Sequence, residues 1–133
     1  MDVLRKPVAV YLLVSALAVL LHFWLSPFYP ESWDVGDIWE VLDAIMAVGI
    51  VATVAYTLSY KRGVDSDAGT LAHVCAYTAF YAATVLAVLF FWNWFDELAS
   101  GDEQSQTRNN FWPIINTMYI VLMGTVGWHL WRK

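Results

Sequence analysis

The stretch "TLAHVCAYTAFYAATVLAVLFFWNWFDEL", residues 70–98, decides the class of fold. It contains no Asp, Glu, Lys or Arg before Asp96, and five of the six residues at 90–95 are aromatic. A helix of about 20 apolar residues, rising about 1.5 Å per residue, crosses the roughly 30 Å hydrocarbon core of a bilayer. Trp beside carboxylates is typical of the membrane–water boundary, because an indole ring contacts hydrocarbon while its N–H reaches polar groups. The stretch therefore predicts a transmembrane helix over 70–95 that leaves the membrane at Asp96.

Composition extends this prediction to the whole chain. Hydrophobic residues make up 59% of the 133 residues and charged residues only 14%, whereas a typical soluble domain carries about 25% charged residues. Four apolar runs are long enough to span a bilayer: about 7–26, 37–60, 70–95 and 112–131. The sequence therefore predicts an all-α integral membrane protein with four transmembrane helices, forming a single domain over residues 1–133.

Two element boundaries follow from local sequence. The first apolar run comes after two basic residues, as in a secretion signal, but it leads into the bulky segment "HFWLSPFYP" instead of a small-residue cleavage site. This pattern predicts a retained helix. Asn109 and Asn110 stand shortly before Pro113, which predicts a capped start of the last helix with Pro in its first turn.

Charge separates the two ends of the predicted helices. Six of the seven basic residues fall at one end: Arg5, Lys6, Lys61, Arg62, Arg132 and Lys133. Nine of the twelve acidic residues fall at the other end, together with Arg108: Glu31, Asp34, Asp37, Glu40, Asp43, Asp96, Glu97, Asp102 and Glu103. Because positively charged loops remain in the cytoplasm, we expect both termini to be cytoplasmic and the chain to be a multi-pass protein of the cell inner membrane. The net charge of −5 argues against nucleic acid and suits a basic partner at the acidic outer face.

Most of the eight Trp residues fall near the outer boundary: Trp24, Trp33, Trp39, Trp92, Trp94 and Trp112. The other two, Trp128 and Trp131, fall near the inner boundary. The simplest interpretation is a belt of aromatic residues at the level of the lipid headgroups. The alternatives are a surface for a partner protein or a flat hydrophobic ligand held among the aromatic rings.

Small residues form stripes on three of the predicted helices. The third helix carries Ala72, Ala76, Ala79, Ala83 and Ala87 at helical spacing. The second helix carries Ala44, Ala47, Val51 and Ala55, and the last helix carries Gly124 and Gly127. In lipid, small side chains let helix backbones approach closely. These stripes predict packing of the second, third and last spans against one another, and they could equally receive a helix of another protein.

Polar residues at one depth of the outer leaflet form a candidate site. The predicted spans place His22, Asp43, Asn116, Glu40 and Asn93 at similar depths. A charged group inside a span costs about 2.5–3.5 kcal/mol on insertion scales, so its presence needs a reason. Imidazole with carboxylate suits copper, zinc or iron, and carboxylate with amide oxygen suits calcium or magnesium. A cation relay is a further possibility. The structural alternative is that Asp43 bonds His22 or Asn116 and ties the helices together.

A second candidate site lies at the inner ends of the third and last spans, where His73 and His129 could ligate a haem axially. The alternative, which is the more common role of single histidines near a membrane boundary, is that each lies at the level of the lipid headgroups as Trp and Tyr residues do. The single cysteine, Cys75, excludes an internal disulfide and any multi-cysteine metal cluster. A P-loop, a Gly-rich dinucleotide turn, a nucleophile elbow and a mid-membrane Lys are all absent from the sequence.

We therefore expect a small accessory or structural subunit of a larger membrane assembly, without catalytic activity of its own. Its expected partners are other membrane subunits and lipid. The small-residue stripes and the aromatic, acidic outer face favour this role. The alternatives are a membrane protein that binds a metal or cofactor through the outer-leaflet cluster, and a small homo-oligomeric cation transporter.

Overall fold

The computed structural model describes residues 2–101 and 106–133, apart from the side chains of Asp2 and Arg108. It contains four long helices and two short ones: α1 (Asp2–Leu25), η1 (Ser26–Phe28), α2 (Val35–Arg62), α3 (Thr70–Ser100), α4 (Gln106–Asn109) and α5 (Phe111–Arg132). Each long helix is long and apolar enough to cross a membrane, and the described ranges contain no strand. The prediction of an all-α membrane fold with four spans is confirmed. Asp102 and Glu103, predicted at the acidic outer face, lie outside the described residues.

The ends of α2 and α3 follow from local chemistry. Asp34 caps α2, because its Oδ1 accepts hydrogen bonds from the N–H groups of Gly36 at 2.8 Å and Asp37 at 3.3 Å. This cap starts the helix two residues before the predicted position. α3 continues to Ser100 and stops at Gly101, whose φ of +58° is a backbone conformation that favours glycine.

The starts of α1 and α5 differ from the sequence prediction. α1 begins at Asp2, so Pro7 lies inside the helix, where its missing N–H removes one backbone hydrogen bond. α5 begins directly after Asn110 and has Pro113 in its first turn, as predicted, but the predicted cap by an asparagine side chain is wrong. Asn110 has helical backbone angles, its side chain makes no capping hydrogen bond, and its N–H donates to the Gln106 carbonyl at 3.1 Å. α5 therefore follows almost directly from the single turn of α4, whose backbone carbonyl binds the Asn110 N–H, and no asparagine side chain caps it.

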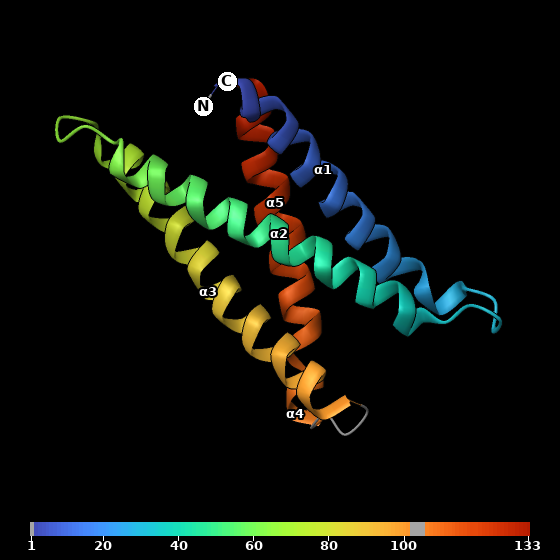
Figure 1. The fold of residues 1–133 in the computed structure, drawn as a ribbon. Helices are drawn as coiled ribbons and strands as arrows, with labels where there is room; N and C mark the ends of the chain where they lie inside the picture. The colour runs from blue at the N-terminus through green and yellow to red at the C-terminus, as the bar shows by residue number, and fades with distance from the viewer. Residues whose placement is uncertain (1, 102–105) are drawn as a thin grey trace.

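The helices pack as two pairs, with α1 along α5 and α2 along α3, and α2 crosses α5 near the middle of the molecule (Figure 1). Both chain termini and the α2–α3 connection lie at one end, which we call the basic end. The connection from α1 to α2 and the short helix α4 lie at the other, which we call the acidic end. α1 and α3 lie on opposite sides of the molecule, so α2 and α5 provide its centre.

Tyr119 of α5 is the central tie of the bundle. Its side chain is fully buried, and its hydroxyl donates a hydrogen bond to Ser15 Oγ of α1 at 2.8 Å. Gly49 of α2 lies directly beneath this hydroxyl, because a Cβ added there would be only 2.5 Å from Tyr119 Oη. Further bonds join α1 to α2, from the Tyr11 hydroxyl to the Ile45 carbonyl at 2.7 Å, and α2 to α5, from Thr53 Oγ1 to the Met123 sulfur at 2.9 Å. Interhelical hydrogen bonds and small residues are the main ties between helices in lipid.

The predicted packing stripes are used unequally. On α3, Ala76 and Ala83 are buried, and Ala72, Ala79 and Ala87 are half-buried. Gly127 packs against α1 rather than α2 or α3, since a Cβ there would lie 3.2 Å from Leu12 Cβ. Gly124 has open space around it.

The predicted stripe on α2 is largely exposed at Ala44, Val51 and Ala55. The buried face of α2 instead includes Met46 and Thr53. Consecutive residues lie about 100° apart around a helix, so a stripe that is predicted one residue away from the buried face points out of the core.

A double-mutant cycle tests the central tie. In Gly49→Ala the new methyl group collides with the Tyr119 hydroxyl, and we expect a loss of about 1–3 kcal/mol in the free energy of unfolding. In a Tyr119→Phe background the nearest ring atoms would be 3.4 and 3.5 Å away, which is ordinary contact, so Gly49→Ala should cost much less. Unfolding in detergent measures both changes. Equal costs in the two backgrounds would show that the hydroxyl does not set the approach of α2 to α5.

Candidate functional site: an acceptor-rich pocket at the acidic end

A pocket of about 500 Å³ lies at the acidic end, and all four long helices contribute to it. Its walls combine carboxylates, amides and aromatic rings: Phe23, Ser26, Gly36, Trp39, Glu40, Asp43, Glu97, Asn109, Trp112, Pro113 and Asn116. This volume lies in the range of sites for small organic ligands. None of the lining residues is Lys or Arg.

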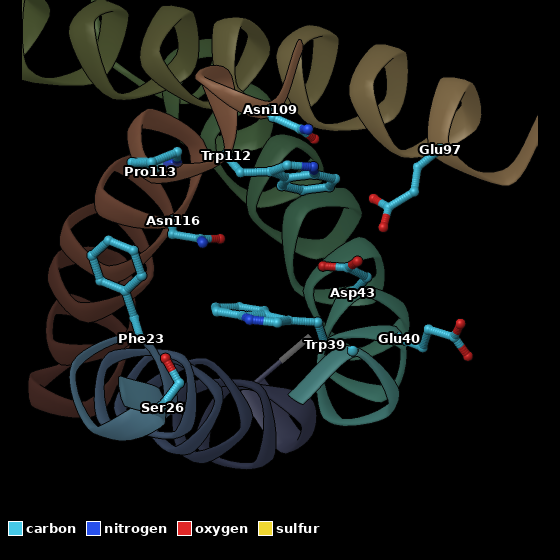
Figure 2. A pocket seen from close by; sticks show the side chains of 11 residues that line it. Phe23, Ser26, Trp39, Glu40, Asp43, Glu97, Asn109, Trp112, Pro113 and Asn116 are labelled. Carbon is cyan, nitrogen blue, oxygen red and sulfur yellow. The ribbon is translucent and has the colours of Figure 1, made fainter. Parts of the chain in front are cut away.

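The polar groups of the pocket are mostly hydrogen-bond acceptors. Asn116 is 4% exposed, and its Oδ1 has no hydrogen-bond partner among the described residues. Oε2 of Glu97 is buried and likewise has no partner in the described part of the chain. Asp43 is only 5% exposed, and its carboxylate points into the same space (Figure 2). The pocket therefore offers negative charge and free acceptor atoms, which a donor with positive charge would satisfy.

Two indole rings form opposite walls of this space. Trp39 and Trp112 lie on either side of the opening, and the Asp43 carboxylate and the Asn116 amide occupy the two remaining sides (Figure 2). The Trp39 ring makes an edge contact with His22, 4.5 Å between ring centroids.

The same two rings are held from behind by further aromatic residues. Trp112 makes an edge contact with Phe90, 6.0 Å between centroids. Behind Trp39, His22 is fixed in turn by Tyr29, whose hydroxyl lies 3.1 Å from His22 Nδ1. These contacts hold both indoles in place before any ligand arrives.

The structure brings together three of the five residues predicted as a metal cluster. Asp43, Asn116 and Glu40 line the pocket, although the Glu40 side chain is exposed and points away from Asp43 (Figure 2). His22 lies behind Trp39 and Asn93 is buried on α3, and neither lines the pocket. In residues 2–101 and 106–133, no group of three or more His, Cys, Asp or Glu side chains is placed to hold a metal ion.

The alternative role of Asp43 as a tie between helices receives no support from the hydrogen bonds. Among the described residues, none joins Asp43 to His22 or to Asn116, and His22 bonds Tyr29 instead. The interhelical ties of this bundle lie deeper, at Tyr119 and Tyr11.

The two histidines at the basic end do not share a pocket. Nδ1 of His73 lies 3.3 Å from the Gly69 carbonyl at the start of its own helix. His129 packs against Tyr60, 5.6 Å between ring centroids, and lines a small hollow that does not include His73. In the described residues, the hollow at His129 therefore does not bring the predicted axial pair for a haem together.

Eight of the lining residues were not predicted as site residues, and three of them give the pocket its charge and its aromatic walls: Glu97, Trp39 and Trp112. Glu97 follows the predicted end of the third span, and only the extension of α3 to Ser100 places it on a helix facing Asp43. The two Trp residues belong to the predicted outer belt of six, and nothing in the sequence separates them from the exposed Trp24 or Trp33.

No protein-family model, no curated protein and no solved structure matches this chain. The function is therefore inferred from the pocket and the surfaces of the bundle.

The stability of Asp43→Asn distinguishes a binding residue from a structural one. Asp43 is buried near the carboxylates of Glu97 and Glu40 without a hydrogen-bond donor in the described ranges, so the neutral amide should relieve repulsion and desolvation. We expect the melting temperature in detergent to rise by a few degrees, since 1 kcal/mol corresponds to roughly 2–8 °C for domains near this size. Asp37→Asn, an exposed change on the same helix, is the matched control and should have little effect. A marked loss of stability in Asp43→Asn would show that Asp43 holds the helices together.

Proposed function

We propose that this chain is a small accessory subunit of a larger membrane protein assembly and receives a transmembrane helix of its partner between α3 and α5. The observation that supports this role is a long apolar groove of about 630 Å³ between those two helices. Its lining is unusually rich in small side chains and includes Cys75, Thr78, Ala79, Ala82, Thr117 and Thr125.

The chemistry of the groove favours a helix as its occupant. Thr117 and Thr125 donate their hydroxyl groups to carbonyls of their own helix, each at 2.7 Å, so these hydroxyls need no outside partner. Small side chains on both walls allow the backbone of a third helix to approach closely, which is the main source of association in lipid. From Val74 to Ala82 the groove follows α3 for roughly 12 Å, or about two helical turns.

The pattern of burial is consistent with a subunit role. α3 is the least buried of the four candidate spans, with 22% of its apolar window inside the molecule, compared with 33–39% for the others. Its exposed residues include the aromatic side chains of Tyr77, Tyr81, Trp92 and Phe95. A partner covering this side of the molecule would bury surface that α2 and α5 leave free.

We further propose that the basic end faces the cytoplasm and that the membrane is the cell inner membrane. Both termini and the α2–α3 connection, with Lys61 and Arg62 beside it, lie at that end (Figure 1). The positive-inside rule assigns such an end to the cytoplasm. A fluorescent protein fused to Lys133 should then fluoresce in cells, and an alkaline phosphatase fused there should be inactive. The opposite pair of results would reverse the orientation.

Cys75 permits a direct test of the groove, because it is the only cysteine, is exposed and lines the groove. A photoreactive maleimide attached to Cys75 of the tagged protein in its own membranes should give one crosslinked adduct of defined mass. Native mass spectrometry of the gently extracted complex should contain the same partner.

The matched control is Cys75→Ser combined with Leu17→Cys, which moves the reactive group to an exposed position on α1, across the molecule from α3 (Figure 1). We expect this variant to lose the discrete adduct. Adducts with lipid alone, the same adduct from both positions, or an adduct only with a second copy of this chain would contradict the proposed subunit role.

A further inference from the structure

The pocket at the acidic end has a composition that the subunit role does not require. It combines two carboxylates, Asp43 and Glu97, with the Asn116 amide oxygen and the facing rings of Trp39 and Trp112. It lies at the acidic end, whereas the groove between α3 and α5 is lined by residues 74–82 of α3, in the half of that helix nearer the basic end, and by residues 117–126 of α5. The two features share no lining residue, so one can be altered without the other.

The acceptor atoms point to a ligand with several N–H donors. The Asn116 side chain is more than nine-tenths buried, and its Oδ1 is directed into the pocket without a partner in the described chain. Glu97 is only half-buried as a residue, but its Oε2 atom is buried and likewise has no partner among the described residues. A buried acceptor without a partner costs roughly 1–3 kcal/mol, and such atoms recur where a ligand satisfies them. The carboxylates add negative charge, which selects a cation among possible donors.

The spacing of these groups favours an organic cation over a bare metal ion. The acceptors lie on different walls of the pocket and do not form a cluster of three His, Cys, Asp or Glu side chains in the described residues (Figure 2). A metal ion needs its ligands within about 2.0–2.6 Å of one point. An ammonium or guanidinium group is wider and directs its N–H bonds to several sides at once.

The indole rings supply the second element of recognition. A cation close to the face of a Trp ring is stabilised by the electrons of the ring, and Trp is the strongest of the aromatic side chains in this respect. Trp39 is supported by His22 and Trp112 by Phe90, so the pocket is shaped in advance. The rings also give an apolar contact for the carbon chain that carries the cationic group.

We infer that this pocket binds an alkylammonium or alkylguanidinium group, with its N–H donors on Asp43, Glu97 and Asn116 and its cationic centre between Trp39 and Trp112. Three sources carry this chemistry: a soluble amine, the ethanolamine headgroup of a lipid, and a Lys or Arg side chain of a partner. All three would enter from the acidic end. The inference goes beyond the proposed subunit role and does not depend on it.

Calorimetric titration of the purified full chain in nanodiscs of phosphatidylglycerol tests the inference, with n-butylammonium and n-butylguanidinium as probes. Both should bind saturably at one site per chain, after subtraction of empty nanodiscs. Na⁺ and Ca²⁺ at the same concentrations should not displace them beyond the effect of ionic strength. Nanodiscs containing phosphatidylethanolamine should weaken the apparent affinity only if the lipid headgroup is the natural source.

Two variants and one control locate the site. Asp43→Asn should lower the affinity for both probes at least tenfold, because it removes a charge that faces the cation. Asn116→Leu should lower the affinity for n-butylammonium at least threefold. It should change the affinity for tetramethylammonium little, because that cation has no N–H group to donate to the Asn116 oxygen. Asp37→Asn removes the same charge from an exposed position outside the pocket and should leave both affinities within twofold.

Three outcomes would overturn the inference. The first is the absence of saturable binding by either probe, and the second is equal affinity in the unmodified chain, Asp43→Asn and Asn116→Leu. The third is displacement by Ca²⁺ or Na⁺ at equal concentration, which would assign the pocket to an inorganic cation. None of these results would affect crosslinking from Cys75, so failure of this inference and failure of the subunit role can be told apart.

Discussion

The contact of Tyr119 with Gly49 and Ser15 determines how close α1, α2 and α5 can lie to one another. In water, burial of apolar side chains would drive such packing, but lipid tails are as apolar as the side chains themselves. The bundle therefore depends on close approach of a helix backbone to a large side chain and on a hydrogen bond between helices. Gly49 provides the space, and Ser15 accepts the Tyr119 hydroxyl at 2.8 Å. In the described part of the chain, α3 packs against α2 and α5 at this level through the buried apolar residues Ala76, Ala83, Leu86 and Phe90.

This arrangement separates stability from recognition along the length of the molecule. The middle of the bundle is closed by fully buried residues, among them Met46, Ile50, Leu86, Tyr119 and Met123. The acidic end contains carboxylates and an amide without donors facing them in the described residues. A chain selected only for stability would replace these acceptors with apolar groups of similar size. Their presence beside a firmly tied centre agrees with the general finding that proteins depart from favourable packing at functional sites.

The buried apolar middle of the bundle also argues against conduction of ions through it. A channel or transporter needs a polar route through the whole bundle, and among the described residues the buried polar side chains in the inner half of α2 are Thr53 and Thr57. Thr57 donates its hydroxyl to the Thr53 carbonyl of its own helix at 2.8 Å, and Thr53 donates to a Met123 sulfur. Neither side chain is available to a moving ion. The pocket thus lies at one end of the bundle, above a middle that is closed by buried apolar residues.

The four spans could be predicted from the sequence because length and lack of charge determine them almost alone. Asp43 and Asn116 could also be predicted as pocket residues, since a carboxylate or an amide inside a span is unusual wherever it points. The direction of a side chain around its helix could not be predicted. His22 was expected among the ligands, yet the next residue, Phe23, lines the pocket while His22 lies behind Trp39. One residue turns the helix by about 100°, and polarity alone does not fix that angle.

The aromatic walls of the pocket likewise become visible only in three dimensions. Six Trp residues near one boundary are equivalent in sequence, and each suits the lipid headgroup region. Trp39 and Trp112 differ because α2 and α5 turn them inward, where His22 and Phe90 occupy the space behind them. Aromatic contacts alone do not separate them from the other Trp residues, since the exposed Trp33 packs against Tyr29 and the exposed Trp92 against Phe111. The difference is that Trp39 and Trp112 both line the pocket. The facing of two indole rings across a carboxylate and an amide is therefore a property of the folded bundle that the count of Trp residues does not contain.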